Sequence, residues 1–259
     1  MKILAVGDMM PGGVLNGTSV AGVSKEILDD LHSVDCVVAT LETAVGNEPT
    51  FFDEKMKRLG DVIYVEDDDL KRLKKLNIRV VSLANNHFFD LGYDGATHTI
   101  ELLDQIGVMH CGAGKNLEEA SKPAVVMHAG ETYAFLGFCD WREEHVGWCP
   151  FATESTPGVN PMFDDYVVSE VSKYAKTYDH VIVLPHWGKE YLLWPKPEIV
   201  KISKKMLNAG AELIFGSHSH CVQPICQKTN KAVAYSMGNF LFPDRLITKP
   251  RSTYYPHPS

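Results

Sequence analysis

The chain has 259 residues, of which 45% are hydrophobic, and its formal net charge is −8 at pH 7. This length suits one large α/β domain, and the apolar fraction is enough for a globular core, which excludes a disordered chain. We expect no nucleic-acid partner, because the sequence has no basic stripe, and no membrane span, because no apolar run approaches the ~18 residues that a spanning helix needs.

Short apolar runs alternate with amphipathic segments in the first half of the chain. The apolar runs predict strands over 3–6, 36–39 and 79–83. The spacing of apolar residues predicts helices over 22–32 and 95–106. Acidic residues precede basic ones over 66–75, which matches a helix dipole and predicts a solvated helix. Residues 47–61 are polar and irregular, so we expect a surface excursion there.

The second half continues the alternation and adds two predicted antiparallel hairpins. The hairpins comprise 123–127 with 133–138, and 222–227 with 232–236. Further strands are predicted over 181–184 and 213–215, and helices over 164–177 and 197–208. Residues 140–162 lack periodicity, which predicts a long loop over one face. The whole pattern predicts a single α/β domain over 1–259, with a largely parallel sheet and an irregular tail over 248–259.

The six cysteines are scattered along the chain, and none forms a CxxC pair. At this size and spacing we expect no disulfide framework. The first apolar run is broken at once by Gly7-Asp8, unlike the core of a signal peptide. These features predict a cytoplasmic protein.

Polar side chains follow five of the predicted strands, close to the point where each apolar run ends. The set comprises two carboxylates, an amide and four imidazoles: Asp8, Glu42, Asn86, His87, His186, His218 and His220. Because ligands bind outside the carboxyl ends of the strands in an open parallel sheet, we expect these groups to converge at one edge. Oxygen and nitrogen donors without thiolate fit Mn, Fe or Zn, or Mg with waters. Each residue alone has a structural interpretation, but their coincidence on one edge favours a metal site.

His218 and His220 stand one residue apart in the sequence GSHSH, directly after an apolar run. In an extended segment their rings would face opposite sides. In a tight loop both rings can turn toward one centre. We therefore expect a tight loop at this position.

Six stretches of the sequence match one family, in the family's order and across nearly the whole chain. They are GDMM at 7–10, TLETAVG at 40–46, LANNHFFDLGYDGATHTIELLDQIGVMHCGAG at 83–114, HWGKEY at 186–191, GAELIFGSHSHCVQP at 210–224 and AYSMGNFLF at 234–242. On these residues the chain resembles the CapA family, named for capsule and poly-γ-glutamate synthesis, within the metallophosphoesterase (calcineurin-like) superfamily.

The resemblance implies a fold and a set of residue roles. The implied fold is a four-layer α/β/β/α sandwich of mixed, largely parallel sheets, with one or two divalent ions (Mn, Zn or Fe) at the strand ends. The implied metal ligands are Asp8 and His220 for a first ion, Glu42 as a bridge, and Asn86, His186 and His218 for a second. The implied catalytic residues are His87, as acid for the leaving group, and Asp90, which would orient it. Expected substrate contacts are Asn85, Glu190, Ser236 and Asn239.

One position departs from the pattern of the superfamily. Many two-metal phosphoesterases begin with Asp-x-His, whereas this chain has Asp8-Met9-Met10. Methionine is a poor ligand for a hard dication, so we expect the first ion to have one protein donor fewer.

The implied activity is a metal-dependent phosphoesterase that uses a metal-activated water and His87 as general acid, linked to capsule or poly-γ-glutamate metabolism. The expected partner is a small anionic substrate or a polyglutamate-type polymer. Two alternatives stay open at this point. One is a metal-dependent γ-glutamyl amide hydrolase, and the other is a non-catalytic, metal-stabilised binding component of a polymer-synthesis complex.

Overall fold

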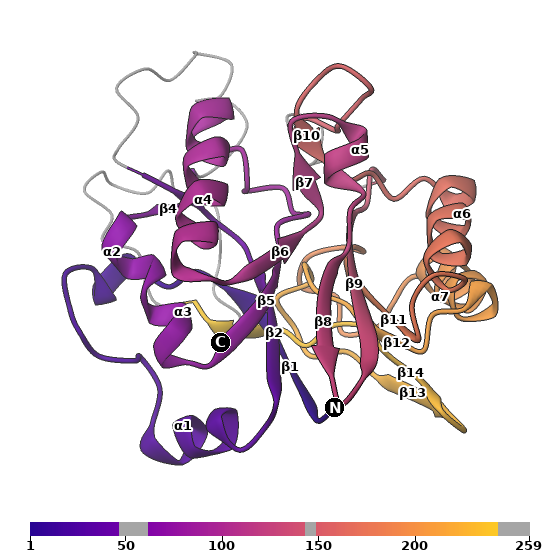
Figure 1. Ribbon diagram of the computed structural model, residues 1–259, viewed down its shortest axis with the longest axis horizontal. Helices are drawn as coiled ribbons and strands as arrows, with labels where there is room; N and C mark the ends of the chain where they lie inside the picture. The colour runs from indigo at the N-terminus through magenta and orange to yellow at the C-terminus, as the bar shows by residue number, and fades with distance from the viewer. Residues whose placement is uncertain (47–61, 143–148, 243–259) are drawn as a thin grey trace.

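The computed structural model describes residues 1–46, 62–142 and 149–242. Two β-sheets stack face to face, and helices cover the outer face of each sheet (Figure 1). The order of layers is helices, sheet, sheet and helices, which confirms the expected α/β/β/α sandwich. The surface excursion predicted over 47–61 and the tail predicted over 248–259 lie outside the described residues.

The first sheet is parallel throughout the described part of the chain. Its strands lie in the order β15 (Asn239–Leu241), β1 (Ile3–Met9), β2 (Cys36–Leu41), β5 (Ile78–Ser82) and β6 (Met109–Cys111). Its outer face is covered by α1 (Lys25–His32), α2 (Asp67–Leu70), α3 (Arg72–Lys75) and α4 (Gly92–Ile106). The sequence did not predict β6 or β15, because each has only three residues and shows no period.

The second sheet is mixed. Its strands lie in the order β13 (Ile225–Lys228), β14 (Lys231–Ala234), β12 (Leu213–Phe215), β11 (His180–His186), β9 (Glu131–Cys139) and β8 (Ala124–His128). The β8–β9 and β13–β14 pairs are antiparallel, which confirms both predicted hairpins. Helices α6 (Asp164–Tyr174) and α7 (Pro197–Ala209) cover its outer face.

Six short elements complete the described structure and lie outside the two large sheets. They are η1 (Gly13–Leu15), β3 (Ala44–Val45), β4 (Tyr64–Val65), β7 (Ala113–Gly114), α5 (Leu117–Ala120) and β10 (Gly158–Val159). The β10 strand pairs antiparallel with β7. It lies inside the stretch 140–162, so the described part of this predicted loop contains a short strand.

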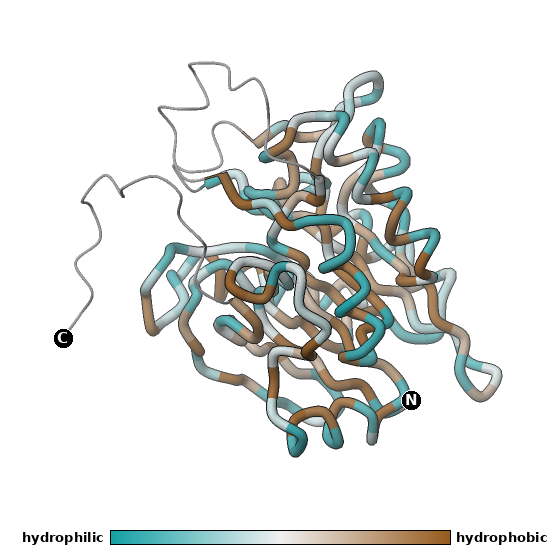
Figure 2. The backbone as a smooth tube through the Cα atoms, turned by 90° about the vertical axis from the view of Figure 1, so that its left-hand side faces the viewer, coloured by the Kyte–Doolittle hydropathy of each residue, from teal (hydrophilic) through white to brown (hydrophobic). Residues whose placement is uncertain are grey.

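Three buried hydrophobic clusters fill the three interfaces between the layers. The cluster between the sheets joins Val38 and Val80 of the first sheet to Phe135 and Ile182 of the second. The other two clusters join each sheet to its own helices. Figure 2 shows hydrophobic segments concentrated in the inner strands, while hydrophilic segments lie mostly on the outer helices and loops.

The two sheets approach each other closely at Gly137 of β9. A Cβ at this position would lie 3.0 Å from the Gly112 Cα and 2.7 Å from the Ser82 Oγ. Any side chain would therefore push the sheets apart near the carboxyl end of β5. Glycine at this position keeps the ends of strands from both sheets close together.

The predicted helix over 66–75 is divided at Lys71 into α2 and α3, and it is only partly solvated. Asp69 and Arg72 are both 3% exposed and form an ion pair at 3.1 Å. Arg72 also donates to the backbone carbonyls of Pro11 and Leu15, at 2.9 and 3.0 Å. The sequence pattern was wrong here, because it could not indicate that an arginine turns inward to satisfy the loop after β1.

In the described ranges, no helix combines the length and apolarity that a membrane crossing requires. All six cysteines lie within these ranges and are free thiols.

The buried Arg72 provides a test of how this loop is held. Replacing Arg72 by methionine leaves the Asp69 carboxylate buried without its partner, so unfolding should become easier by about 3–5 kcal/mol. Urea denaturation of both proteins measures the difference. The matched control is Lys71→Met, because Lys71 and Asp68 form an exposed ion pair, whose loss costs about 0–1 kcal/mol. Equal effects of the two substitutions would contradict this role of Arg72.

Candidate metal centre

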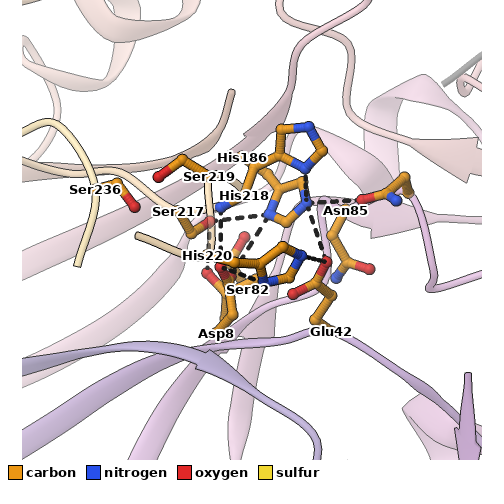
Figure 3. Close-up of polar contacts among 12 residues, drawn as sticks. Asp8, Glu42, Ser82, Asn85, His186, Ser217, His218, Ser219, His220 and Ser236 are labelled. Atoms are coloured by element: carbon orange, nitrogen blue, oxygen red, sulfur yellow. Dashed lines mark hydrogen bonds and ion pairs between the residues drawn. The ribbon is translucent and has the colours of Figure 1, made fainter. Parts of the chain in front are cut away.

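A cluster of polar side chains lies where the carboxyl ends of strands from both sheets meet. Strands β1, β2 and β5 lead to it from the first sheet, and β11 and β12 lead to it from the second. The strand pattern alone predicted convergence at one edge of one sheet, and in this respect it was wrong, whereas the family resemblance implied the two sheets that are present. The five strands are divided between two sheets, and their side chains face each other across the site (Figure 3).

The residues predicted as metal ligands gather in two groups that share one carboxylate. The groups are Asp8, Glu42 and His220, and Glu42, His186 and His218. Within each group the potential ligand atoms lie within 4.8 Å of one another. Asn86 joins the second group, because its Oδ1 lies 2.7 Å from His186 Nε2. Glu42 belongs to both groups, which is the place of the bridging carboxylate implied by the family resemblance.

The rings of His186 and His220 present the same nitrogen to Glu42. His186 Nε2 lies 3.6 Å from Glu42 Oε1, and His220 Nε2 lies 3.8 Å from the same oxygen. The other nitrogen of each ring is held by a neighbour, since His186 Nδ1 lies 2.9 Å from Ser217 Oγ and His220 Nδ1 lies 2.7 Å from Asn239 Oδ1. Hydrogen bonds of this kind fix ring orientation in metal sites.

The loop after β12 turns two alternate imidazoles toward the same centre. His218 and His220 have φ angles of 90° and 54°, in the left-handed region that side chains rarely adopt. A hydrogen bond holds this loop against β1, since His218 N donates to Asp8 Oδ2 at 2.9 Å. Backbone strain of this kind costs on the order of 1–3 kcal/mol per residue and occurs mainly at functional sites. The tight loop expected from GSHSH is thus present.

Burial shifts the proton equilibria of two members of the cluster. Desolvation raises the pKa of Asp8 to about 6, although the charge of His220 and the His218 N–H oppose the shift. Burial and the nearby positive charge of His218 lower the pKa of His186 well below its usual value. The imidazole of His186 is therefore neutral at pH 7, which is the form that binds metal.

The residues at this site fit a divalent cation. Asp8 Oδ1 is buried and makes no hydrogen bond within the described structure, where His186 Nδ1 lies 3.7 Å away. A buried carboxylate oxygen without a donor is costly, and a bound cation would compensate it. Carboxylate, amide and imidazole donors without thiolate suit Mn, Zn or Fe.

Met10 does not add a donor to this set. Its side chain is 1% exposed and belongs to the hydrophobic cluster between the first sheet and its helices. The first group therefore has three protein donors, whereas the second has four when Asn86 is included. The two groups thus differ in their number of potential donor residues.

His87 lies beside the cluster and is paired with Asp90. His87 Nδ1 lies 2.8 Å from Asp90 Oδ2, which also accepts from Ile63 N at 2.6 Å. The His87 side chain is 13% exposed and the Asp90 side chain is fully buried. His87 directly follows Asn86, whose Oδ1 lies 2.7 Å from His186 Nε2, so its backbone lies next to the second group. The structure thus brings the predicted acid and its predicted orienting carboxylate together at this site.

The four residues predicted to contact a substrate have different surroundings. Asn85 is fully buried, with Nδ2 donating to Leu41 O at 2.8 Å and Oδ1 accepting from His87 N at 3.0 Å, so it holds the His87 loop against β2 instead. Ser236 is 2% exposed and accepts from Gly238 N. Asn239 holds the His220 ring. Glu190 is half-buried in the turn after β11 and belongs to neither metal group.

Two positioning residues were missed by the sequence analysis. Ser217 holds His186 Nδ1 and also accepts from Thr40 Oγ1 at 3.1 Å, so it joins the two sheets. Asp140 directly follows β9, and its backbone N donates to His186 O at 2.9 Å. The signal for Asp140 was available, since it is another polar residue that follows an apolar run, but its segment was assigned to a loop.

Comparisons with known proteins identify the family of the chain and support its fold. The family described as "Bacterial capsule synthesis protein PGA_cap" matches residues 2–244. The chain belongs to this family. The PGA biosynthesis protein CapA of Bacillus subtilis (strain 168) is 29% identical over 242 residues, covering 92% of this chain and 62% of that protein.

Two further curated proteins are similar to the chain. The capsule biosynthesis protein CapA of Bacillus anthracis is 30% identical over 253 residues, covering 93% of this chain and 60% of that protein. A probable polyglutamine synthesis accessory protein of Mycobacterium tuberculosis (strain ATCC 25618 / H37Rv) is 28% identical over 226 residues, covering 84% of this chain and 58% of that protein. The chain thus spans about three fifths of the length of these curated relatives.

A solved structure supports the fold alone. The crystal structure of a hypothetical protein from Thermus thermophilus superposes with a TM-score of 0.52 at 14% identity, covering 92% of this chain and 76% of that chain.

The shared position of Glu42 predicts how its substitution affects metal binding. Glu42→Gln removes a charge from both groups, so the affinity for Mn²⁺ or Zn²⁺ should fall by more than about 100-fold, beyond the usual effect of a residue that only supports a ligand. Isothermal titration calorimetry measures affinity and stoichiometry. Glu190→Gln is the matched control, because this nearby carboxylate lies outside both groups. Wild-type affinity in Glu42→Gln would contradict the assignment.

Proposed function

We propose that the protein is a metal-dependent phosphoesterase. The observation that carries the proposal is the place of Glu42 in two adjacent donor groups beside the His87–Asp90 pair. Asp8, Glu42 and His220 would hold one divalent ion, and Glu42, Asn86, His186 and His218 would hold a second. When bound, such ions supply positive charge for the phosphoryl oxygens and lower the pKa of a water nucleophile.

The side chains around the donor groups have distinct tasks in this proposal. In the doubly protonated form of His87, Nδ1–H donates to Asp90, and Nε2–H is the proton that would pass to the leaving oxygen. General acid catalysis of this kind contributes about 10²–10⁴-fold to the rate. Asn85 fixes the backbone of His87 by accepting from its N–H. Burial of Asp8 and Glu42 excludes water and strengthens the field of the site.

A second candidate function is hydrolysis of γ-glutamyl amides, and it is favoured by the names of the relatives. Those proteins are named for biosynthesis of capsule, PGA or polyglutamine. The same donor groups would polarise an amide carbonyl, and His87 would protonate the leaving amine. Metal-loaded protein supplied with phosphate esters and with γ-glutamyl peptides separates the two, because the first candidate releases phosphate or an alcohol and the second releases an amine.

A third candidate uses the same names without catalysis. In it, the protein is a metal-stabilised binding component of a polymer-synthesis complex that engages a polyglutamate-type polymer. It predicts tight metal binding and no turnover of esters or amides. The buried carboxylates give the bare site negative charge, so binding of a polyanion would depend on the bound cations.

The role of His87 has a specific kinetic signature. His87→Asn should retain metal but slow hydrolysis of phenyl phosphate by about 10²–10⁴-fold. Hydrolysis of p-nitrophenyl phosphate should slow less, because nitrophenolate leaves readily without a proton. Asp90→Asn should show the same leaving-group dependence with a smaller loss, since it acts through the ring of His87.

Steady-state rates for both esters with Mn²⁺, Zn²⁺, Fe²⁺, Co²⁺ and Mg²⁺ test this signature. Absence of wild-type turnover with every ion would contradict the proposed function. Equal slowing of both esters in His87→Asn would contradict the role of His87 as the acid.

A further inference from the structure

A patch of exposed apolar side chains borders the metal centre on the side of His220. We call it the apolar rim, and it comprises Tyr191, Leu192, Leu193, Trp194 and Val222. Their exposed fractions are 59%, 38%, 63%, 73% and 72%, so each keeps more than a third of its surface accessible. Four consecutive large apolar residues at a surface are uncommon in soluble domains, and contiguous exposed patches mark binding sites.

The backbone of Tyr191 is tied to the loop that carries the two metal-site histidines. Tyr191 N donates to Ser219 O at 2.8 Å, between His218 and His220. Its φ angle is 59°, a left-handed conformation that is costly for a bulky residue. Its ring lies near that of His220, with centroids 5.9 Å apart and planes tilted by 32°. The ring is therefore held against a predicted metal ligand, and more than half of its surface stays accessible.

Contacts on the other side of the loop place Val222 near the same centre. Gln223 Nε2 donates to Leu192 O at 2.8 Å, which joins the two segments of the apolar rim. Val222 Cγ2 lies 3.3 Å from the position of a Cβ on Gly238, and Gly238 O accepts from Asp8 N at 2.9 Å. These contacts place Tyr191 and Val222 beside the site, and Leu193 and Trp194 continue the chain from there.

We infer that the apolar rim binds the alcohol portion of the substrate, and that this portion is a flat, apolar group such as an aryl ring. The inference rests on the proposed function, because it assumes that a phosphoryl group occupies the neighbouring donor groups. A purely polyanionic substrate has no use for five uncharged apolar side chains at this position. An aryl ester would present its phosphoryl group to the charged centre and its ring to the rim, beginning at Tyr191.

Binding of phosphonates tests the inference without turnover. Phenylphosphonate and methylphosphonate carry the same charged group and differ only in the apolar group attached to it. The Mn²⁺-loaded wild-type protein should bind phenylphosphonate about tenfold or more tightly, as burial of an aromatic ring predicts. Calorimetry gives both dissociation constants. Trp194 reports the same event by fluorescence, since its side chain is 73% exposed before binding.

Substitutions in the rim identify the surface responsible. The double variant Tyr191→Ala/Trp194→Ala should bind methylphosphonate like the wild type and lose most of its preference for phenylphosphonate. Tyr191→Phe keeps the ring and should keep the preference. Met127→Ala is the matched control, because Met127 is 69% exposed on β8 and pairs with the opposite end of β9 from the site.

The remaining outcomes separate this inference from the proposed function. Equal affinity of the wild type for the two phosphonates, together with ester turnover, would overturn the inference and retain the function. Binding of neither phosphonate to the metal-loaded protein would overturn both. If the double variant instead loses self-association in gel filtration or binding to lipid vesicles, with its phosphonate preference intact, the rim serves another occupant and the inference is wrong.

Discussion

Asp8 and Glu42 are both fully buried, and the cost of burying two carboxylates governs what surrounds them. An isolated carboxylate in a protein interior is strongly destabilised unless positive charge or hydrogen-bond donors lie close to it. Here the imidazoles of His186 and His220 lie within 4.0 Å of these carboxylates, and the His218 N–H donates to one of them. The same carboxylate oxygens and imidazole nitrogens are potential ligands that would attract a divalent cation. One constraint thus links the stability of this region to its proposed chemistry.

The fold meets this constraint by bringing the ends of strands from two sheets together. Each sheet alone would expose its carboxylates or imidazoles to water. Ser217 links Thr40 of the first sheet to His186 of the second, and Gly137 allows the sheets to come close. Outer hydrogen bonds with Ser217, Asn239 and Asp90 then hold the rings of His186, His220 and His87. These supports determine which nitrogen of each ring faces the site, so the geometry depends on residues beyond the ligands.

Much of the site could be predicted from sequence, because a polar residue directly after a buried strand lies at the carboxyl end of that strand, where α/β folds bind ligands. That rule found Asp8, Glu42, His186 and the His-x-His pair, and short turns between neighbouring apolar runs indicated both hairpins. It could not assign the strands to two sheets, since a parallel strand has the same pattern in either. Nor could it assign Asn85 to a structural role, because an amide that binds backbone has the same local sequence as one that contacts a ligand.

Other features depended on contacts distant in sequence. The return of the chain through β15 places Asn239 opposite Asp8 in the register, although the two residues are separated by most of the chain. Arg72 turns inward because carbonyl groups of the loop after β1 need donors, and no local period records that need. The spacing of apolar residues in the sequence could not predict the apolar rim either. Exposed and buried apolar runs have the same composition, and only the fold separates them.

The central claim is that Glu42 is shared by two bound cations at the junction of the sheets. Anomalous diffraction at the manganese edge, from crystals grown with Mn²⁺, tests it most directly. The account predicts two peaks, one beside Asp8 and His220 and one beside His186 and His218, with Glu42 oxygens in contact with both. Peaks elsewhere in the molecule, or a peak at this junction that Glu42 does not contact, would contradict it.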